Sequence, residues 1–90
     1  MMPLYDEILE DYNDFFIREG KAPNELHIPQ RYSDEFDEII RRSESYWKSD
    51  PFGKVKYSWF MGMRCFNEIF TFGVSWSEET DKIKKTLGMI

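Results

Sequence analysis

The opening of the chain carries a stripe of apolar residues that constrains its fold more than any other feature. The stripe consists of Tyr5, Ile8, Leu9, Tyr12, Phe15 and Phe16. Spacings of three and four place side chains on one face of an α-helix, which turns by about 100° per residue. Gly20 follows the stripe, and glycine readily adopts the left-handed conformation that ends a helix. The sequence therefore predicts a helix over residues 4–19 with one apolar face.

The same segment carries the net charge of the chain. Its carboxylates fall on the side opposite the apolar stripe, at Asp6, Glu7, Glu10, Asp11 and Asp14. Residues 1–19 contain six acids and one base, whereas the remaining 71 residues contain 11 of each, so the net charge of -5 belongs to the first helix. The sequence therefore predicts one acidic element on an otherwise neutral chain.

A short strand and a second helix are expected next. Pro23 and Pro29 enclose residues 24–28, in which apolar and polar residues alternate with the period of a half-buried strand. Because proline donates no hydrogen bond to a neighbouring strand, the two prolines indicate a strand at the edge of a sheet. Beyond them, helical spacing returns and predicts a second helix over residues 30–46, followed by a turn at 49–53.

Residues 55–76 alternate between apolar and polar positions and predict a β-hairpin. Odd positions form the apolar row of the first strand and even positions that of the second. A turn at Asn67 and Glu68 pairs Cys65 with Phe70 and brings both rows to the same face. The opposite, outward face then carries Phe60, Arg64 and Phe66, with Ile69 across the turn.

Ser77 is a favoured residue type for a helix N-cap, and acids follow it directly, so a last helix is expected to start there. Ninety residues suit one domain, since domains usually contain about 100–150 residues. We therefore expect a single α+β domain over residues 1–90, ordered α-β-α-β-β-α, with helices packed on a small antiparallel sheet and a C-terminal β-hairpin. The expected core consists of Tyr5, Ile8, Tyr12, Phe15, Phe36, Ile40, Trp59, Met61, Phe72 and Trp76.

Few residues suggest a catalytic or metal-binding site. His27 is the one side chain that titrates near neutrality, and no serine or cysteine near it in the sequence completes a relay. Cys65 is the only thiol, so it cannot form an internal disulfide, and one cysteine with one histidine is too few ligands for a structural zinc site. We expect a surface His27, a buried Cys65, and no catalytic, metal or cofactor site.

Nothing in the sequence indicates a membrane or an exported protein. It contains no run of about 18 apolar residues, which a membrane-spanning helix requires. Residues 1–6 lack the basic start and apolar run of a signal peptide. We therefore expect a cytoplasmic protein.

Two surfaces are candidates for binding a partner. The outward hairpin residues Phe60, Arg64, Phe66 and Ile69 place large apolar groups beside basic ones, which indicates a protein partner, self-association or cover by another element of the chain. Direct nucleic-acid binding is not expected, because the aromatic Tyr57 and Trp59 lie on the other face and the chain as a whole repels phosphate. The second candidate is the acidic face of the first helix, which could imitate the charge of a nucleic-acid backbone or be an ordinary solvated face.

Part of the sequence resembles small α+β proteins encoded by bacteriophages and prophages. The resemblance lies in Pro23-Asn24-Glu25-Leu26-His27-Ile28-Pro29-Gln30-Arg31-Tyr32, followed by Phe36 and by Phe60-Met61-Gly62-Met63. It implies a phage or prophage origin, in a bacterial or phage-infected host cell, and it carries no activity or site residue. We predict a non-enzymatic protein that acts through protein contacts, with an acidic inhibitor of a host nucleic-acid enzyme or defence complex as the alternative.

Overall fold

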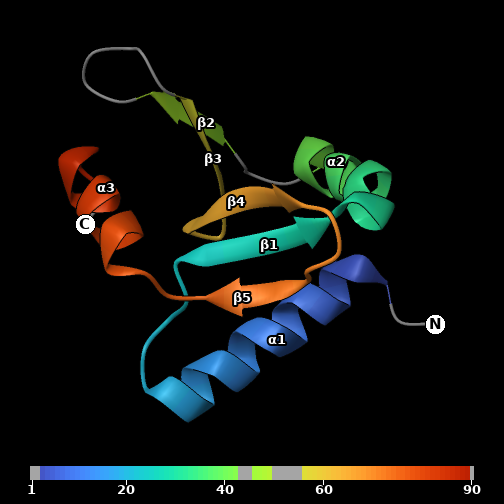
Figure 1. Cartoon of the computed structure of the whole chain (residues 1–90), viewed down its shortest axis with the longest axis horizontal. Helices are drawn as coiled ribbons and strands as arrows, with labels where there is room; N and C mark the ends of the chain where they lie inside the picture. Colours follow the sequence, from blue (N-terminus) through green and yellow to red (C-terminus); the bar gives the residue numbers. More distant parts are fainter. Residues whose placement is uncertain (1–2, 43–45, 50–55, 90) are drawn as a thin grey trace.

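Helices and a mixed five-stranded sheet make up most of the computed structural model, which describes residues 3–42, 46–49 and 56–89 (Figure 1). The predicted α+β class is confirmed. The elements are α1 (Leu4–Glu19), β1 (Glu25–Pro29), the 3-10 turn η1 (Gln30–Tyr32), α2 (Ser33–Arg42), β2 (Tyr46–Ser49), β3 (Lys56–Phe60), β4 (Met63–Glu68), β5 (Gly73–Ser75) and α3 (Glu78–Thr86).

Helix α1 confirms the first prediction, with the expected bounds. Gly20 ends it with φ at 72°, and the Gly20 N–H donates to the carbonyl of Phe16. Its buried side chains are Leu4, Ile8 and Phe15, whereas Tyr5 and Phe16 are 43% and 52% exposed. The apolar arc of α1 is wider than the surface it packs against, so the centre of the arc is covered and its margins face solvent.

Strand β1 lies inside the sheet, in the order β2-β3-β4-β1-β5, so the predicted edge position is wrong. It pairs in parallel with β4 and antiparallel with β5. The prolines permit this because Pro23 precedes the strand and Pro29 is its last residue, where neither interrupts the pairing with β5 at residues 25–27. The sheet is therefore mixed rather than antiparallel.

The predicted hairpin register is wrong, because the chain turns earlier than Asn67 and Glu68. Met61 and Gly62 have φ of 54° and 78° and form a two-residue turn that pairs Phe60 with Met63. Positive φ at both central residues is the geometry of the turn that best joins twisted antiparallel strands, and glycine supplies it without strain. After this turn β4 runs beside β1, so β4 and β5 lie on opposite sides of β1 instead of facing each other.

The second helix is shorter than predicted. It begins as η1, continues as α2 to Arg42, and gives way to β2, which pairs with β3 through Tyr46 and Trp59. Tyr46 therefore belongs to a strand rather than to the helix. Of the turn expected at 49–53, only Ser49 lies within the described residues, as the last residue of β2.

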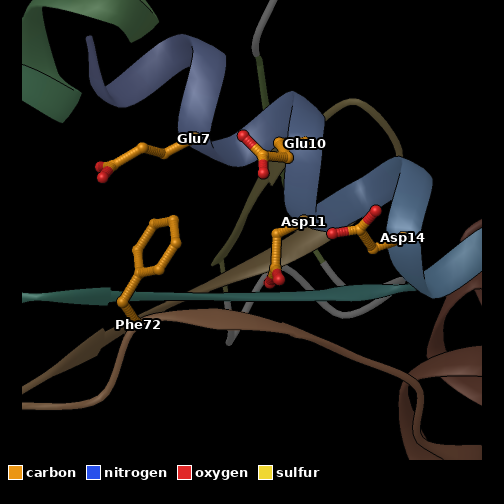
Figure 2. Close-up of a pocket in the computed structure, with 5 residues that line it drawn as sticks. All are labelled: Glu7, Glu10, Asp11, Asp14 and Phe72. Carbon is orange, nitrogen blue, oxygen red and sulfur yellow. The ribbon is translucent and has the colours of Figure 1, made fainter. Parts of the chain in front are cut away.

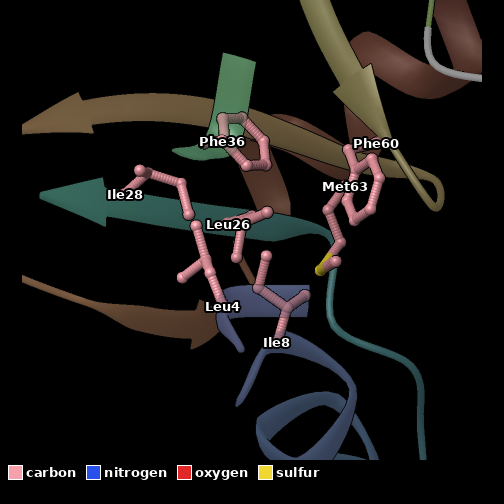
Figure 3. Packing of buried hydrophobic residues seen from close by; sticks show 7 residues of the cluster. All are labelled: Leu4, Ile8, Leu26, Ile28, Phe36, Phe60 and Met63. Carbon is pink, nitrogen blue, oxygen red and sulfur yellow. The ribbon is translucent and has the colours of Figure 1, made fainter. Parts of the chain in front are cut away.

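The main core lies between α1, α2 and one face of the sheet (Figure 3). It contains Leu4, Ile8, Leu26, Ile28, Phe36, Phe60 and Met63. Of the expected core residues, Ile8, Phe15, Phe36 and Trp59 are buried and Tyr12, Ile40 and Phe72 pack against the cluster. The expectation was wrong for Tyr5, Met61 and Trp76, which are exposed, because Met61 lies in the turn and Trp76 lies beyond the end of β5.

Helix α3 begins as predicted, with Ser77 as its N-cap and the Ser77 hydroxyl accepting a hydrogen bond from Thr80 N. The side chain of Asn24 fastens this cap to the start of β1. Its amide Nδ2 donates to the carbonyl of Ser77 over 2.9 Å, and its Oδ1 accepts from the N–H of Ser77 over 2.9 Å. Asn24 is buried, so this reciprocal pair holds α3 at one end of the sheet.

Candidate functional site

Four of the five predicted acidic residues line one groove beside α1. Figure 2 shows the carboxylates of Glu7, Glu10, Asp11 and Asp14 along the helix with the ring of Phe72 facing them. We call these five residues the acidic groove, whose volume is about 190 Å³. Asp6, the remaining predicted acid, is exposed and is not part of the lining.

Asp11 has a structural task within this groove. Its Oδ2 accepts a hydrogen bond of 2.8 Å from the backbone N–H of Val74 in the edge strand β5. Glu7 and Asp11 are both half-buried, so the prediction that the acids all lie opposite the packed face of α1 is wrong for these two. The packed face is centred on Leu4, Ile8 and Phe15, and this rotation of the helix turns Asp11 toward β5.

The predicted hairpin surface is divided by the observed fold. Phe60 is 3% exposed and its ring meets those of Tyr5 and Phe36 edge to face, so its predicted outward position is wrong. The early turn at residues 61–62 explains this, because it pairs Phe60 with the buried Met63 on the helix-covered face. Arg64 and Phe66 are half-buried, and the Arg64 guanidinium lies 4.6 Å from the centre of the Phe66 ring.

Ile69 keeps its predicted exposure and has an unpredicted neighbour. Ile69 is 68% exposed and Phe70 is 80% exposed, although the predicted register placed Phe70 inward. Together with Gln30 and Arg31 they line an open cavity of about 390 Å³, and we call these four residues the loop corner. The Arg31 side chain donates to the carbonyl of Phe70 over 3.3 Å, so η1 and the loop after β4 are held together.

His27 has partners that are distant in the sequence. Its Nδ1 lies 2.8 Å from Glu68 Oε1 and its Nε2 lies 2.9 Å from Ser75 Oγ. The Ser75 hydroxyl also donates to Glu25 Oε1, and the Thr80 hydroxyl donates to Glu25 Oε2 over 2.7 Å. The His27 ring stacks on Phe66, with 5.0 Å between centroids. We call Glu25, His27, Glu68, Ser75 and Thr80 the His27 cluster.

A carboxylate, an imidazole and a hydroxyl in a row have the arrangement of a serine nucleophile with its base. The Ser75 hydroxyl has one hydrogen, and two acceptors lie within reach of it, His27 Nε2 at 2.9 Å and Glu25 Oε1 at 3.1 Å. The five side chains direct their polar atoms at one another, and they line neither the acidic groove nor the cavity of the loop corner. We therefore interpret the His27 cluster as a structural network that joins β1, β4, β5 and α3.

Cys65 lies only in part where the sequence predicts it. Its side chain is half-buried and packs against the main core, so it is less enclosed than expected. The structure brings no group of three or more histidine, cysteine, aspartate or glutamate side chains into a metal-binding arrangement among the described residues. Within the same residues, no helix is long and apolar enough to cross a membrane.

The sequence patterns did not point to Gln30, Arg31 and Phe70 of the loop corner. One signal was available, because Ile69 and Phe70 are consecutive large apolar residues, and a strand with one covered face leaves one of two such neighbours exposed. The partners of His27 had no local signal, since Glu68 and Ser75 lie 41 and 48 residues further along the chain.

Comparisons with known proteins return no relative. No protein-family model, no curated protein and no solved structure was found to match the chain. The candidate residues above are therefore assigned from their geometry alone.

Proposed function

We propose that this chain is a non-enzymatic protein that acts through protein contacts made by the loop corner. The observation that carries the proposal is the exposure of two consecutive large apolar side chains, Ile69 at 68% and Phe70 at 80%. They stand beside an open cavity that Gln30 and Arg31 complete. Such a concentration of apolar surface around one cavity is typical of sites at which another protein is bound.

Two features support a binding role over a catalytic one. The loop corner offers a guanidinium, an amide and two apolar side chains, and none of these types is a usual nucleophile or general base. Arginine and aromatic residues are instead the types that contribute most to protein–protein affinity. The His27 cluster is satisfied internally by its own hydrogen bonds, as described above.

Replacing Phe70 with Ser tests this proposal. The variant should fold like the wild type, because the Phe70 side chain is mostly in solvent, and it should lose the binding of its partner. Ile17→Ser is the matched control, since Ile17 is also 80% exposed but lies on α1. Partners would be captured from a bacterial lysate with tagged protein and identified by mass spectrometry. Equal capture by wild type and Phe70→Ser would remove the loop corner from consideration.

The acidic groove favours a second candidate function, an acidic inhibitor that occupies a basic groove of a nucleic-acid enzyme or defence complex. Four carboxylates converge on one groove beside an aromatic ring, and such a site attracts lysine and arginine side chains. Reversing Glu10 and Asp14 to Lys changes the net charge by about +4 and should weaken such binding sharply, as should raising the salt from about 50 to 200 mM. If neither the charge reversal nor the added salt changes the affinity for a partner, the inhibitor function is excluded.

The phage or prophage origin and the cytoplasmic location remain part of the proposal. The origin rests on the sequence resemblance, and the location is carried over from the sequence-based expectation. Localisation of the tagged protein by fractionation of a bacterial host tests the second point, and its recovery outside the cytoplasm would contradict it.

A further inference from the structure

The loop corner and the acidic groove are neighbours on the same surface. Tyr32 connects them, because the Arg31 guanidinium lies 4.8 Å from the centre of the Tyr32 ring and that ring meets Phe72 edge to face at 6.0 Å. Arg31 belongs to the loop corner and Phe72 to the acidic groove. Only Thr71 separates Phe70 from Phe72 in the sequence. The half-buried Tyr32 and Phe72 therefore lie between a cation on one side and carboxylates on the other, with the exposed Ile69 and Phe70 beside the cation.

We propose that this surface binds a second copy of the same chain about a twofold axis. The inference rests on the proposed function, because it names the partner of the loop corner. In a twofold interface a residue of one copy meets a different residue of the other, and the reverse contact is made at the same time. With the axis passing near Tyr32 and Phe72, Arg31 of each copy faces the acidic groove of the other, and the apolar side chains of both copies meet around the axis.

The charges favour a second copy over an unrelated partner. Among the described residues, Arg31, Glu7 and Glu10 form no ion pair within the chain. In a twofold dimer, Arg31 of one copy lies opposite Glu7 and Glu10 of the other copy, because both signs of charge are present on the same surface. A partner carrying a single sign of charge would match either Arg31 or the acidic groove and would leave the other facing a like charge.

Exchange of charges between two variants tests the pairing. Arg31→Glu places acid against acid in both halves of the interface, and the double variant Glu7→Lys with Glu10→Lys places base against base. Each variant alone should dimerise at least about tenfold more weakly than the wild type, while an equimolar mixture of the two should regain dimers, because both halves then pair opposite charges. Sedimentation equilibrium up to about 1 mM protein gives the dissociation constants, over a range that covers weak interfaces.

Control variants distinguish loss of the charge pairs from general repulsion between acidic or basic chains. Glu78→Lys with Glu79→Lys changes the net charge by the same amount as the groove variant but on α3, so it should leave dimerisation unchanged within about threefold if general repulsion is not the cause. Phe70→Ser should abolish the dimer, and Ile17→Ser should not. Circular dichroism of every variant confirms that the fold is retained.

The outcomes separate this inference from the proposed function. The twofold interface is refuted if the wild type is monomeric at every concentration up to about 1 mM. It is also refuted if the mixture of Arg31→Glu with the Glu7→Lys, Glu10→Lys variant forms no more dimer than either variant alone. If Phe70→Ser nevertheless loses a partner captured from lysate, the loop corner still binds a protein and only its identity as a second copy is refuted. If the wild type dimerises and the mixture regains dimers, both the surface and its occupant are supported.

Discussion

Truncating Asn24 to Ala gives the sharpest test of how α3 is held on the sheet. The amide group makes two hydrogen bonds of 2.9 Å with the backbone of Ser77, and Asn24 is 3% exposed. Truncation leaves one donor and one acceptor of Ser77 without these partners, and each such group costs about 1–3 kcal/mol when it is shielded from water. Ser77 is only half-buried, so water restores part of the loss and we expect about 2–4 kcal/mol in total.

Urea denaturation followed by tryptophan fluorescence measures this cost, and amide hydrogen exchange locates it. Exchange should accelerate most in α3, because the Asn24 pair joins its N-cap to β1. Asn13→Ala is the matched control, since Asn13 is exposed on α1, and its free energy of unfolding should change by less than about 0.5 kcal/mol. If Asn24→Ala is as mild as the control, the reciprocal pair does not anchor α3.

Three other changes test separate parts of the fold by the same denaturation assay. Phe60→Ala should lower the free energy of unfolding by about 3–5 kcal/mol and Phe70→Ala by less than about 1 kcal/mol, and equal effects would contradict the placement of Phe60 in the core. Gly73→Ala should cost about 1–3 kcal/mol, because φ is 149° and a Cβ would lie 3.3 Å from Asp11 Oδ2; an unchanged stability would refute that close approach. His27→Gln should lower the free energy of unfolding by about 1–3 kcal/mol, and by less when Glu68 is already replaced with Gln. If the effects of the two substitutions add, the two side chains are not coupled.

The candidate surfaces illustrate how far residue patterns lead toward a site. The sequence predicts the acidic residues of α1, because charge is a property of each residue and the spacing of the acids places them on one helix. Their meeting with Phe72 to form the acidic groove was not foreseen, since it depends on where β5 passes the helix. For Phe60 the alternation predicts the wrong face, because the turn at Met61 and Gly62 breaks the odd–even pattern and places Phe60 on the same face as Met63.

Local structure was determined by the sequence itself. Helix α1 has the predicted bounds and ends at Gly20, and α3 starts at the Ser77 cap, because the contacts that form a helix and its ends join residues only a few positions apart. Helical periodicity and a terminating glycine are therefore sufficient evidence, whatever surrounds the element.

The partners of each strand were decided only by the tertiary structure. Alternation in residues 55–76 identifies two faces but does not specify which strand lies alongside, and β1 enters between β4 and β5 from far earlier in the chain. The early turn puts Phe60 in the core, and the insertion of β1 gives His27 its partners Glu68 and Ser75 and leaves Phe70 in solvent. Segments that are distant in sequence compete to pair with the same strand, and the pairing that forms is the one that best buries the whole sheet. No short stretch of residues therefore encodes the strand order.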